Sequence, residues 1–482
     1  MQITVNSLQE DIREEVSRMR TAPSSVKDIL QKMLDGICTV DFHELTETPD
    51  SEKIGRKEYI ISIIDELLRI AASHKWDLTT KNSLIYLYDG AKWVAVREDQ
   101  FKSFLRNVAI SMGAPAKDSR YFRFQDDLFR QFFAASDIPA QDLPPSTVLI
   151  NMKNGTFEFT PQGRRIRGHR KEDFLTYQLP FGYDENADCP KFKAFLDRNL
   201  PDKGSQDVIA EYLGYVFAPF LRFEKVLLLY GDGANGKSVL FQIVSALLGP
   251  ENISSYSLQS LTSKEGYQRA EIGNKLLNYA TEINGKIDSS LFKQLASSEP
   301  IEARYIYGRA FILDRYARLM FNCNVLPSEV ELTHAFFRRF IIVPFEVIIP
   351  EAEQDRDLAE KIIADELPGI FNWILKGLDR LLVNKIFSTS EKIANAGKAF
   401  REQSDSFSIF MSDSGMEPGM DNSMLMSTFY QEYSRFCRGC NLLPVSMKDF
   451  SDKLLRVGFQ KQHKRNGNLV YYKTISDSYE QS

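Results

Sequence analysis

The chain contains 482 residues, 43% of them hydrophobic, which is enough for two to four domains whose cores need no disulfide. The formal net charge of −5 excludes a surface that is basic everywhere, but it allows local basic patches that bind nucleic acid. Five scattered cysteines do not form the framework of a secreted disulfide-rich protein, so we expect a cytoplasmic location. The acidic N-terminal stretch is unlike a signal peptide and no apolar run approaches the ~18 residues of a membrane span, which predicts no membrane partner.

Residues 1–78 are predicted to be a helical N-terminal region. Apolar residues recur at helical spacing in "GRKEYIISIIDELLRIAASH", which follows a polar stretch typical of a linker. This region contains no chemical motif and receives no predicted role. Residues 79–204 are predicted to form a small α+β domain, because strand-like alternation surrounds Asp89-Gly90 and Asn154-Gly155, two turn signals of β-hairpins.

Residues 205–350 have the pattern of an α/β domain. Continuous apolar segments alternate with helical or loop segments, as expected for a parallel sheet that is buried on both faces. The strand candidates are "KVLLLYG", "NKLLNYATE", "ARLMFNCN" and "RFIIVPFEVI". A helical block is predicted for residues 351–400. Residues 401–482 have the helix, helix and hairpin order of a winged helix, with basic residues in the hairpin.

The segment "GDGANGKS", from Gly231 to Ser238, satisfies the pattern GxxxxGK[ST] at every fixed position. An apolar strand precedes it and an amphipathic helix follows it, and this context favours a phosphate-binding loop over a chance glycine-rich turn. Glycines let backbone N–H groups face a phosphate, and the helix N-terminus adds positive potential. Lys237 is expected to reach the β and γ phosphates of ATP, and the Ser238 hydroxyl to complete a Mg²⁺ shell. The predicted ATP-binding residues are Gly231, Gly233, Ala234, Asn235, Gly236, Lys237, Ser238 and Val239.

Residues downstream indicate what such a site does with the nucleotide. Glu282 ends the strand candidate "KLLNYATEI", where a carboxylate can polarise the attacking water. Asn324 ends the next strand, where an amide can touch the γ-phosphate, although asparagine also commonly starts a turn before a proline. Arg338 and Arg339 precede a further strand. They form either a solvated pair or the arginine that reaches a neighbouring subunit's nucleotide in a ring.

The order of these segments resembles the superfamily 3 helicase domain of phage and plasmid primase-helicases, a group related to the poxvirus primase-helicase. The resemblance rests on "LLLYGDGANGKSVL", "LLNYATEI", "LFKQLASSEPIEARYIYGRAFILDRYARLMFNCNVLP", "AFFRRFIIVPFE" and "ELPGIFNWILKGLDRLL". Upstream, "VLINMKNGTFEF", "DFLTYQLPFGYDENADCPKFKAFL" and "EYLGYVFAP" look like the domain that precedes the helicase in that family. The resemblance covers roughly residues 80–385 and implies an AAA+-like P-loop ATPase that forms a homo-hexameric ring around DNA and moves along a single strand.

The resemblance also implies catalytic roles. Lys237 and Ser238 match the Walker A pair, Glu282 matches the Walker B carboxylate and is the second Mg²⁺ ligand, and Asn324 matches the sensor asparagine. Arg339 is the preferred arginine finger and Arg338 the second choice. One departure is that Thr281 precedes Glu282 where many relatives have two adjacent acidic residues.

Predicted DNA contacts fall in two places. Lys293 and Arg304 match the lysine and arginine of the family's B-prime segment, and Arg309 lies in the region of the pore hairpin. The segment "ASSEPIEAR" departs from relatives, which often have glycine and aspartate there. Near the tip of the predicted wing, basic side chains favour contact with DNA phosphates. These residues are Lys461, Lys464 and Arg465.

Two other clusters leave alternatives open. The stretch "GRRIRGHRK" is either a solvated loop or a phosphate-tracking patch. Its basic residues are Arg164, Arg165, Arg167, Arg170 and Lys171. Cys437 and Cys440 form one CxxC without a second ligand pair beside it, which favours a reduced structural pair over a metal site.

The sequence thus predicts an ATP-dependent DNA helicase, a ring-shaped replicative motor of a phage, plasmid or other mobile element that binds a single strand of forked duplex DNA in its central pore. Only some 75 residues precede the recognisable region, which is too few for a primase domain, so we expect any primase or polymerase to be a separate partner. One alternative is an ATP-controlled DNA-binding replication initiator or helicase loader that does not unwind processively. A second alternative is a P-loop kinase of small molecules.

Overall fold

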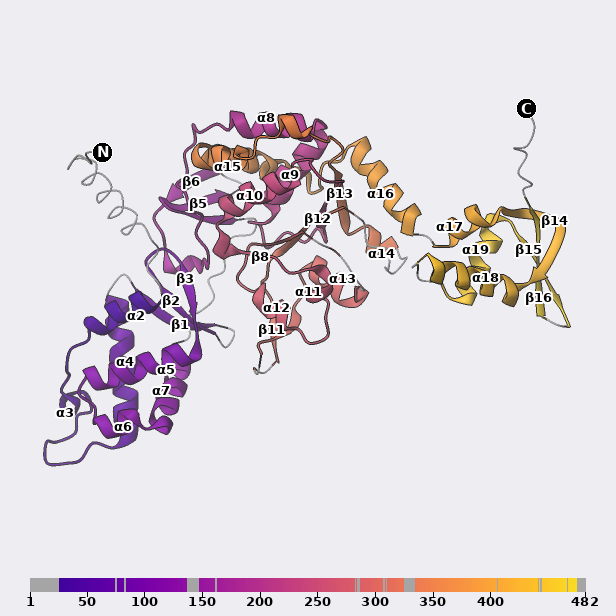
Figure 1. Ribbon diagram of the computed structural model, residues 1–482. Helices are drawn as coiled ribbons and strands as arrows, with labels where there is room; N and C mark the ends of the chain where they lie inside the picture. Colours follow the sequence, from indigo (N-terminus) through magenta and orange to yellow (C-terminus); the bar gives the residue numbers. More distant parts are fainter. Residues whose placement is uncertain are drawn as a thin grey trace, which may run out of the picture. The chain divides into compact units, whose positions relative to one another are not determined.

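The computed structural model describes residues 26–73, 76–81, 84–136, 147–160, 163–281, 283, 287–306, 308, 310–324, 334–404, 406–440, 442, 444–465 and 467–474 (Figure 1). Two compact units divide the chain, with the boundary between Gln178 and Leu179. The predicted boundary at residues 204/205 lies inside the second unit. Among the described helices, none combines the length and the hydropathy that crossing a bilayer requires.

The first unit contains helices and two small antiparallel sheets. Its helices are α2 (Val26–Asp35), α3 (Phe42–Leu45), α4 (Arg56–Ser73), α5 (Glu98–Ser111), α6 (Ala116–Arg120), α7 (Phe122–Ala135) and the 3-10 helix η1 (Lys171–Asp173). One sheet has the order β1 (Asp77–Lys81), β2 (Leu84–Tyr88), β3 (Trp93–Val96), and the other β4 (Val148–Met152), β5 (Gly155–Thr160), β6 (Gly163–Arg167). The hairpins predicted at Asp89-Gly90 and Asn154-Gly155 are confirmed as β2–β3 and β4–β5.

A single hydrophobic core joins α2, α4, α5 and α7 to the first sheet. It includes Ile63 and Leu67 of α4, Leu87 of β2 and Phe132 of α7, all fully buried. The amphipathic pattern of α4 accounts for this, because its apolar residues recur at helical spacing and share one face. The predicted boundary between residues 78 and 79 therefore lies within one core.

The second unit is built on a five-stranded parallel sheet with the order β13-β7-β12-β9-β8. The strands are β7 (Val226–Tyr230), β8 (Ile253–Ser254), β9 (Leu277–Ala280), β12 (Arg318–Cys323) and β13 (Phe340–Pro344). All four strand candidates of this region are confirmed, and so is the α/β class. Residues Val226 to Leu229 of β7 have no exposed surface, as expected for a central strand covered on both faces.

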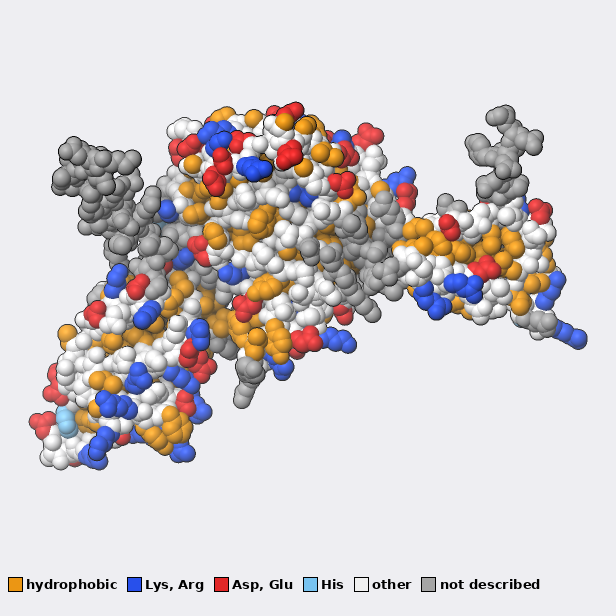
Figure 2. Space-filling model, viewed as in Figure 1, with side chains coloured by type: hydrophobic (Ala, Val, Ile, Leu, Met, Phe, Trp, Pro, Cys, Tyr) orange, Lys and Arg blue, Asp and Glu red, His pale blue; other side chains and the backbone are white. Residues whose placement is uncertain are grey.

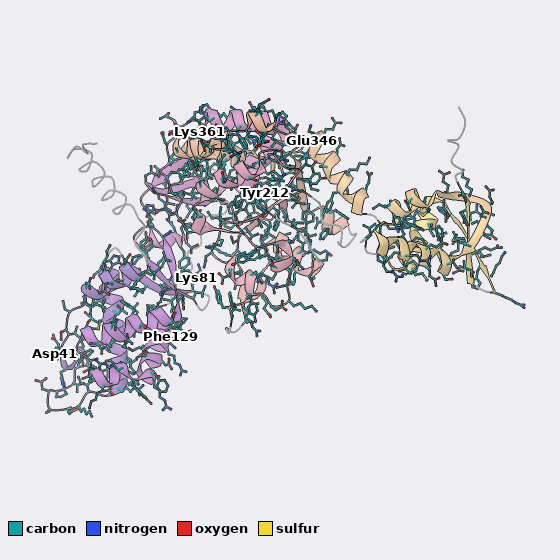
Figure 3. All side chains as sticks on the ribbon, in the orientation of Figure 1. Asp41, Lys81, Phe129, Tyr212, Glu346 and Lys361 are labelled. Carbon is teal, nitrogen blue, oxygen red and sulfur yellow. The ribbon has the colours of Figure 1, made fainter. Side chains whose placement is uncertain are left out.

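Helices and one hairpin surround this sheet. They are α8 (Pro190–Asn199), α9 (Lys203–Tyr215), α10 (Lys237–Leu248), η2 (Pro250–Asn252), α11 (Leu258–Leu261), α12 (Tyr267–Glu271), α13 (Ser289–Ser297), the β10 (Ile301–Arg304)–β11 (Ala310–Leu313) hairpin, α14 (His334–Phe337), η3 (Glu351–Glu353), α15 (Leu358–Asn384) and α16 (Glu391–Ser404). Residues 351–400 are thus mainly helical, in agreement with the predicted helical block. Tyr212 of α9 ties this helix to the sheet, because its buried hydroxyl donates a 2.5 Å hydrogen bond to the Leu319 carbonyl of β12 (Figure 3).

The C-terminal segment has a core of its own. Its elements are α17 (Ser406–Ser414), β14 (Met416–Leu425), α18 (Met426–Gly439), α19 (Met447–Val457), β15 (Gln460–Lys464) and β16 (Gly467–Thr474). The strands form an antiparallel sheet in the order β14-β16-β15. In the core, the Phe450 ring stacks on Tyr433 and meets Phe429 edge to face. The predicted helix, helix and hairpin are present, and β14 is an additional strand that precedes them.

Candidate functional site

The loop between β7 and α10 has a backbone that only glycine tolerates at two points. Gly231 and Gly236 have φ angles of 153° and 89°. A Cβ atom on Gly231 would lie 2.3 Å from the Phe345 carbonyl oxygen, and one on Gly236 would lie 2.5 Å from Nδ2 of Asn199. The glycines at these two motif positions are therefore required by the packing of the loop as well as by its turn.

Buried polar contacts hold this loop from two sides. The Asn235 side chain is almost fully buried, and its Nδ2 donates a 3.0 Å hydrogen bond to the Phe345 carbonyl just after β13. Asn199, at the end of α8, donates through Nδ2 to the Asn235 carbonyl at 3.1 Å. The loop geometry thus depends on α8 and on the chain that leaves β13, both distant in sequence.

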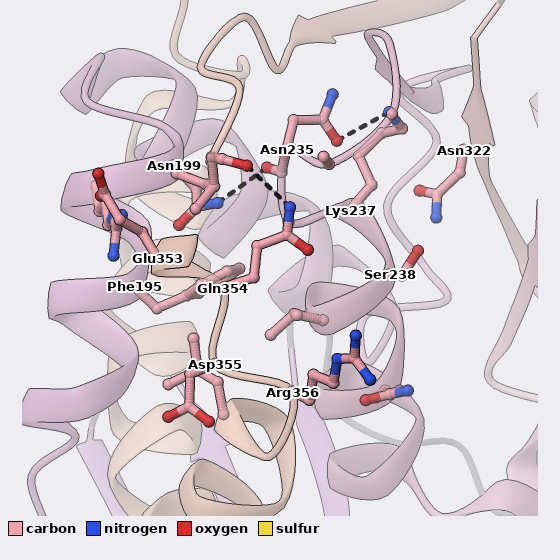
Figure 4. A pocket seen from close by; sticks show the side chains of 18 of the residues that line it. Phe195, Asn199, Asn235, Lys237, Ser238, Asn322, Glu353, Gln354, Asp355 and Arg356 are labelled. Atoms are coloured by element: carbon pink, nitrogen blue, oxygen red, sulfur yellow. Dashed lines mark hydrogen bonds and ion pairs between the residues drawn. The ribbon is translucent and has the colours of Figure 1, made fainter. Parts of the chain in front are cut away.

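Lys237 is 6% exposed and turns back into the loop. Its ammonium donates to the carbonyls of Gly231 at 2.6 Å and Asp232 at 2.9 Å. It also donates to Oδ1 of Asn235 at 3.0 Å (Figure 4). Burial lowers the pKa of Lys237. Phosphate oxygens can replace these uncharged acceptors, and such an exchange gives the desolvated cation a negatively charged partner.

A cavity of about 780 Å³ opens in front of the loop (Figure 4). The loop and the first turns of α10 form one side, including Lys237 and Ser238, while α8 and residues 349–358 form the opposite side. An ion pair between Arg198 of α8 and Glu353 of η3 joins the two parts of this opposite side. The size and the apolar and polar lining of the cavity suit a ligand as large as a nucleotide.

The carboxyl ends of β9 and β12 also reach this cavity. Thr281, Asn322 and Asn324 all line it. Asn324 was selected from the sequence, whereas Asn322 was not, although side chains two residues apart lie on the same face of a strand. Asn322 is 5% exposed, and its Oδ1 accepts a 2.9 Å hydrogen bond from the Tyr279 hydroxyl of β9.

The predicted Mg²⁺ ligands are described only in part. Ser238 lines the cavity at the start of α10, where its hydroxyl can serve as a ligand. Glu282 lies outside the described residues. Among the described residues, no group of three or more histidine, cysteine or acidic side chains is arranged to hold a metal ion. A P-loop Mg²⁺ site needs no such group, because phosphate and water supply most of its ligands.

The two predicted finger arginines lie at the opposite edge of the sheet from the loop. They precede Phe340, which pairs with Val226 at the start of β7, whereas the loop follows the end of β7. A five-residue strand separates the two edges by roughly 16 Å. The Arg338 side chain is 51% exposed and that of Arg339 only 9%, and Glu224 pairs with both, at 2.7 and 3.0 Å. Exposure therefore favours Arg338, the second choice from the sequence, for contact with another subunit.

The predicted DNA contacts are dispersed over the second unit. Lys293 lies half-buried on α13, and Arg304 is exposed at the end of β10; Arg309 lies outside the described residues. At the tip of the β10–β11 hairpin, Tyr305 and Ile306 are 39% and 67% exposed. In the C-terminal segment, exposed basic residues lie on β15 and in the turn after it. They are Lys461, Lys464 and Arg465.

The "GRRIRGHRK" cluster is largely compensated by acidic partners within the first unit. Arg167 forms a bidentate pair with Asp173, at 2.7 and 2.8 Å, and also contacts Glu158. Arg165 pairs with Glu158 at 3.0 Å, and its hydrogen bond is the main cause that lowers the pKa of Glu158. Lys171 pairs with Asp77. These contacts favour the structural interpretation of the cluster over a phosphate-tracking patch.

Two family models match parts of the chain. Residues 57–201 match the family described as "D5 N terminal like". Residues 229–339 match a family of unknown function, DUF5906, and this segment contains the loop, Asn324 and both candidate finger arginines.

Two viral proteins are similar to the chain at low identity. One is "Putative helicase L207/L206" of Acanthamoeba polyphaga mimivirus, with 24% identity over 42% of this chain and 22% of that protein. The other is "Putative helicase 121R" of Invertebrate iridescent virus 3, with 22% identity over 56% of this chain and 33% of that protein. The matches therefore span a third or less of each relative. Solved structures of the apo NrS-1 C-terminal region align with 85% of this chain and 98% of theirs, at 11% identity and TM-scores of 0.46 and 0.47.

Proposed function

We propose that the chain is an ATP-dependent DNA helicase of the superfamily 3 type, with an AAA+-like P-loop ATPase core. The observation that carries this proposal is the loop at the β7–α10 junction, with a buried Lys237 at the rim of a cavity that Asn322 and Asn324 also line. The names of the two viral relatives and the D5 N-terminal-like match support a helicase-type role in replication.

In the proposed reaction, Lys237 leaves the loop carbonyls and binds the β and γ phosphates of ATP. Backbone N–H groups of the loop and of the first turn of α10 hold the remaining oxygens, and Ser238 binds Mg²⁺. Glu282 acts as the base that orients water. Asn324 holds that water or the γ-phosphate, and Asn322 is fixed beside it by Tyr279. The product phosphates leave through the open side of the cavity.

The site is completed in this proposal by a neighbouring subunit. Because Arg338 and Arg339 lie at the edge of the sheet away from their own loop, either can serve only a site outside its own cavity. A closed homo-hexameric ring brings the two edges together. An arginine in that position stabilises the charge that develops on the transferred phosphoryl group.

DNA contacts are proposed for two surfaces. The β10–β11 hairpin presents Tyr305, Ile306 and Arg304 and is the candidate element for gripping a single strand in the pore. The C-terminal segment has the element order of a winged helix, and its exposed Lys461, Lys464 and Arg465 suit phosphate contacts on a forked duplex. A separate primase or polymerase remains the expected partner.

A strand-displacement assay tests the proposed function. Purified chain is incubated with a forked duplex, Mg²⁺ and ATP, and the released strand is measured. We expect displacement that requires ATP, and none with Lys237→Ala, because the variant lacks the cation for the β and γ phosphates. ATPase activity and DNA binding without displacement would favour the alternative, an initiator or helicase loader. ATP turnover by a monomeric chain, without stimulation by DNA, would favour a small-molecule kinase.

A further inference from the structure

The junction between α6 and α7 presents two aromatic rings to solvent. The segment Lys117–Arg123, which we name the 117–123 corner, contains Tyr121 and Phe122 at 42% and 60% exposure. Their centroids lie 5.0 Å apart in an edge-to-face arrangement. Folding alone does not explain two adjacent aromatic rings in water, since the hydrophobic core of this unit is already filled by neighbours such as Phe124.

The same corner carries cations without acidic partners. Lys117, Arg120 and Arg123 are exposed, and among the described residues none of the three has a carboxylate within ion-pair distance. Asp118 is the one acidic residue in the corner, so its net charge is 3 − 1 = +2. The Arg123 guanidinium lies 5.8 Å from the Phe122 ring centroid. By contrast, the denser "GRRIRGHRK" cluster has Glu158, Asp173 and Asp77 as partners.

Hydrogen bonds fix the backbone that carries these rings. Tyr121 ends α6 by donating its N–H to the Asp118 carbonyl at 2.9 Å, and its own carbonyl accepts from the Phe124 N–H at 3.0 Å as α7 begins. Phe124 is 1% exposed and anchors the first turn of α7 in the core. Arg56, paired with Asp127, lies 5.6 Å from the Tyr121 ring centroid. A backbone that is already fixed loses little conformational entropy when a ligand binds to it.

We propose that the 117–123 corner binds single-stranded nucleic acid outside the ATPase unit, with bases stacked on Tyr121 and Phe122 and phosphates near Lys117, Arg120 and Arg123. Unpaired bases expose ring faces that stack on aromatic side chains, whereas the bases of a duplex are already stacked on each other. The positive charge favours a polyanion over a neutral or basic surface. Figure 2 shows hydrophobic side chains next to Lys and Arg side chains over α6 and α7.

Fluorescence anisotropy with a labelled oligothymidylate and a duplex of equal length tests this site in the full chain. We expect Phe122→Ala to weaken binding of the single strand by about five- to tenfold and that of the duplex by less than about twofold, and Phe122→Trp to restore it. Arg120→Gln combined with Arg123→Gln should lower the slope of log affinity against log salt by about 1.4, the value for two phosphate contacts on a single strand. Val383→Ala, at an 80% exposed apolar residue, and Arg165→Gln, at a paired arginine, are the matched controls.

Cross-linking locates the bound strand directly. With a photoreactive uridine oligonucleotide, we expect peptides that contain Tyr121 and Phe122 among the cross-linked products, and their loss in Phe122→Ala. The proposal would be overturned if both corner variants bind the oligonucleotide with unchanged affinity and cross-links occur only in other peptides. It would also be overturned if the corner binds a protein and not the oligonucleotide. ATPase activity without DNA should stay at the wild-type level in all corner variants, so failure here is distinct from failure of the proposed helicase function.

Discussion

At the scale of single residues, burial decides which side chains can react. Cys323 is the last residue of β12, and burial raises the pKa of its thiol to about 12, an effect that the nearby Lys237 charge only partly opposes. Burial likewise raises the pKa of Cys189 to about 11 and that of Cys437 above its ordinary value. Cys38 and Cys440 are exposed. A thiolate is the reactive form, so the three buried thiols stay protonated and unreactive near neutral pH.

Alkylation of the native protein at mild alkaline pH should therefore divide the cysteines into two classes. We expect Cys38 and Cys440 to be modified at least about tenfold faster than Cys189, Cys323 and Cys437. Peptide mass spectrometry after timed treatment with iodoacetamide measures the rates, and protein denatured in concentrated urea is the control in which all five react. Rapid native labelling of Cys323 would contradict the buried position of β12.

The pair Asn322 and Asn324 illustrates how residues of the site differ in predictability. Asn324 ends an apolar run before a turn, a signal that is visible locally. Asn322 lies inside that run, and only the pairing of β12 with β9 brings Tyr279 to its side-chain oxygen. The same limit applies to Arg338 and Arg339, because exposure depends on Glu224 and on packing around β13.

At the scale of elements, the helical block matters because of how closely α15 approaches α9. A Cβ atom on Gly377 of α15 would lie 2.4 Å from the Ala210 carbonyl carbon of α9, and one on Gly214 of α9 would lie 2.8 Å from Cβ of Leu378. Glycines thus allow near contact of the two backbones. Buried Glu211 of α9 adds hydrogen bonds from Arg380, at 3.0 Å, and from the Ser388 N–H, at 2.7 Å.

Alanine substitution should have opposite effects at two helical glycines. Gly377→Ala should destabilise the second unit by about 1–3 kcal/mol, because the new methyl group meets backbone atoms of α9. Gly397→Ala in α16 should stabilise by up to about 1 kcal/mol, because nothing lies within 4 Å of the added carbon and alanine favours the helix. Urea unfolding of each variant measures the difference, and unchanged stability of Gly377→Ala would contradict the close α9–α15 packing.

A buried carboxylate connects the helical block to the wall of the cavity. Glu366 of α15 is 4% exposed, and its two oxygens accept hydrogen bonds from the N–H groups of Lys191 and Phe192, each at 2.9 Å, in the first turn of α8. It acts as an N-terminal cap supplied by another helix. Since α8 carries Asn199, which bonds to the loop, the cap also supports the loop.

Glu366→Ala should therefore lower stability by about 2 kcal/mol and weaken nucleotide binding severalfold, because the cap is lost and α8 is no longer fixed. Asp365→Ala is the matched control: it removes an ion pair with Lys191 in which both partners are largely exposed, at 67% and 47%, and should cost less than about 1 kcal/mol. Thermal unfolding and titration with a fluorescent ATP analogue measure both effects. Equal effects of the two substitutions would argue against a capping role.

At the scale of the whole molecule, a composite ATPase site predicts complementation between subunits. Lys237→Ala removes the cation proposed to bind phosphate but keeps Arg338, and Arg338→Ala does the reverse. When the two variants are mixed, some interfaces combine an intact loop with an intact arginine, so we expect ATPase activity above the mean of the separate variants. The same experiment with Arg339→Ala in place of Arg338→Ala tests the other candidate. Unchanged nucleotide affinity of the Arg339→Ala variant shows that its own nucleotide-binding site is intact.

If the ATPase activity of Lys237→Ala mixed with either arginine variant only equals the mean of the separate variants, a composite site built from these residues is excluded. Mass measurement with an ATP analogue and forked DNA complements the assay, since a ring predicts a closed oligomer around the strand. If only one of the two arginine variants restores ATPase activity when it is mixed with Lys237→Ala, the arginine replaced in that variant is the finger.

The residue pattern alone predicts the glycine-containing loop between β7 and α10 and the parallel sheet around it. Both depend on short-range chemistry: glycines reach positive φ where other residues clash, and continuous apolar runs must be buried on both faces. Which basic residues find an acidic partner depends on the tertiary structure. Arg165, Arg167 and Lys171 of the dense "GRRIRGHRK" cluster pair with Glu158, Asp173 and Asp77, whereas the basic residues of the 117–123 corner have no such partner among the described residues. Electrostatic pairing depends on distances between segments, and these distances exist only in the folded chain.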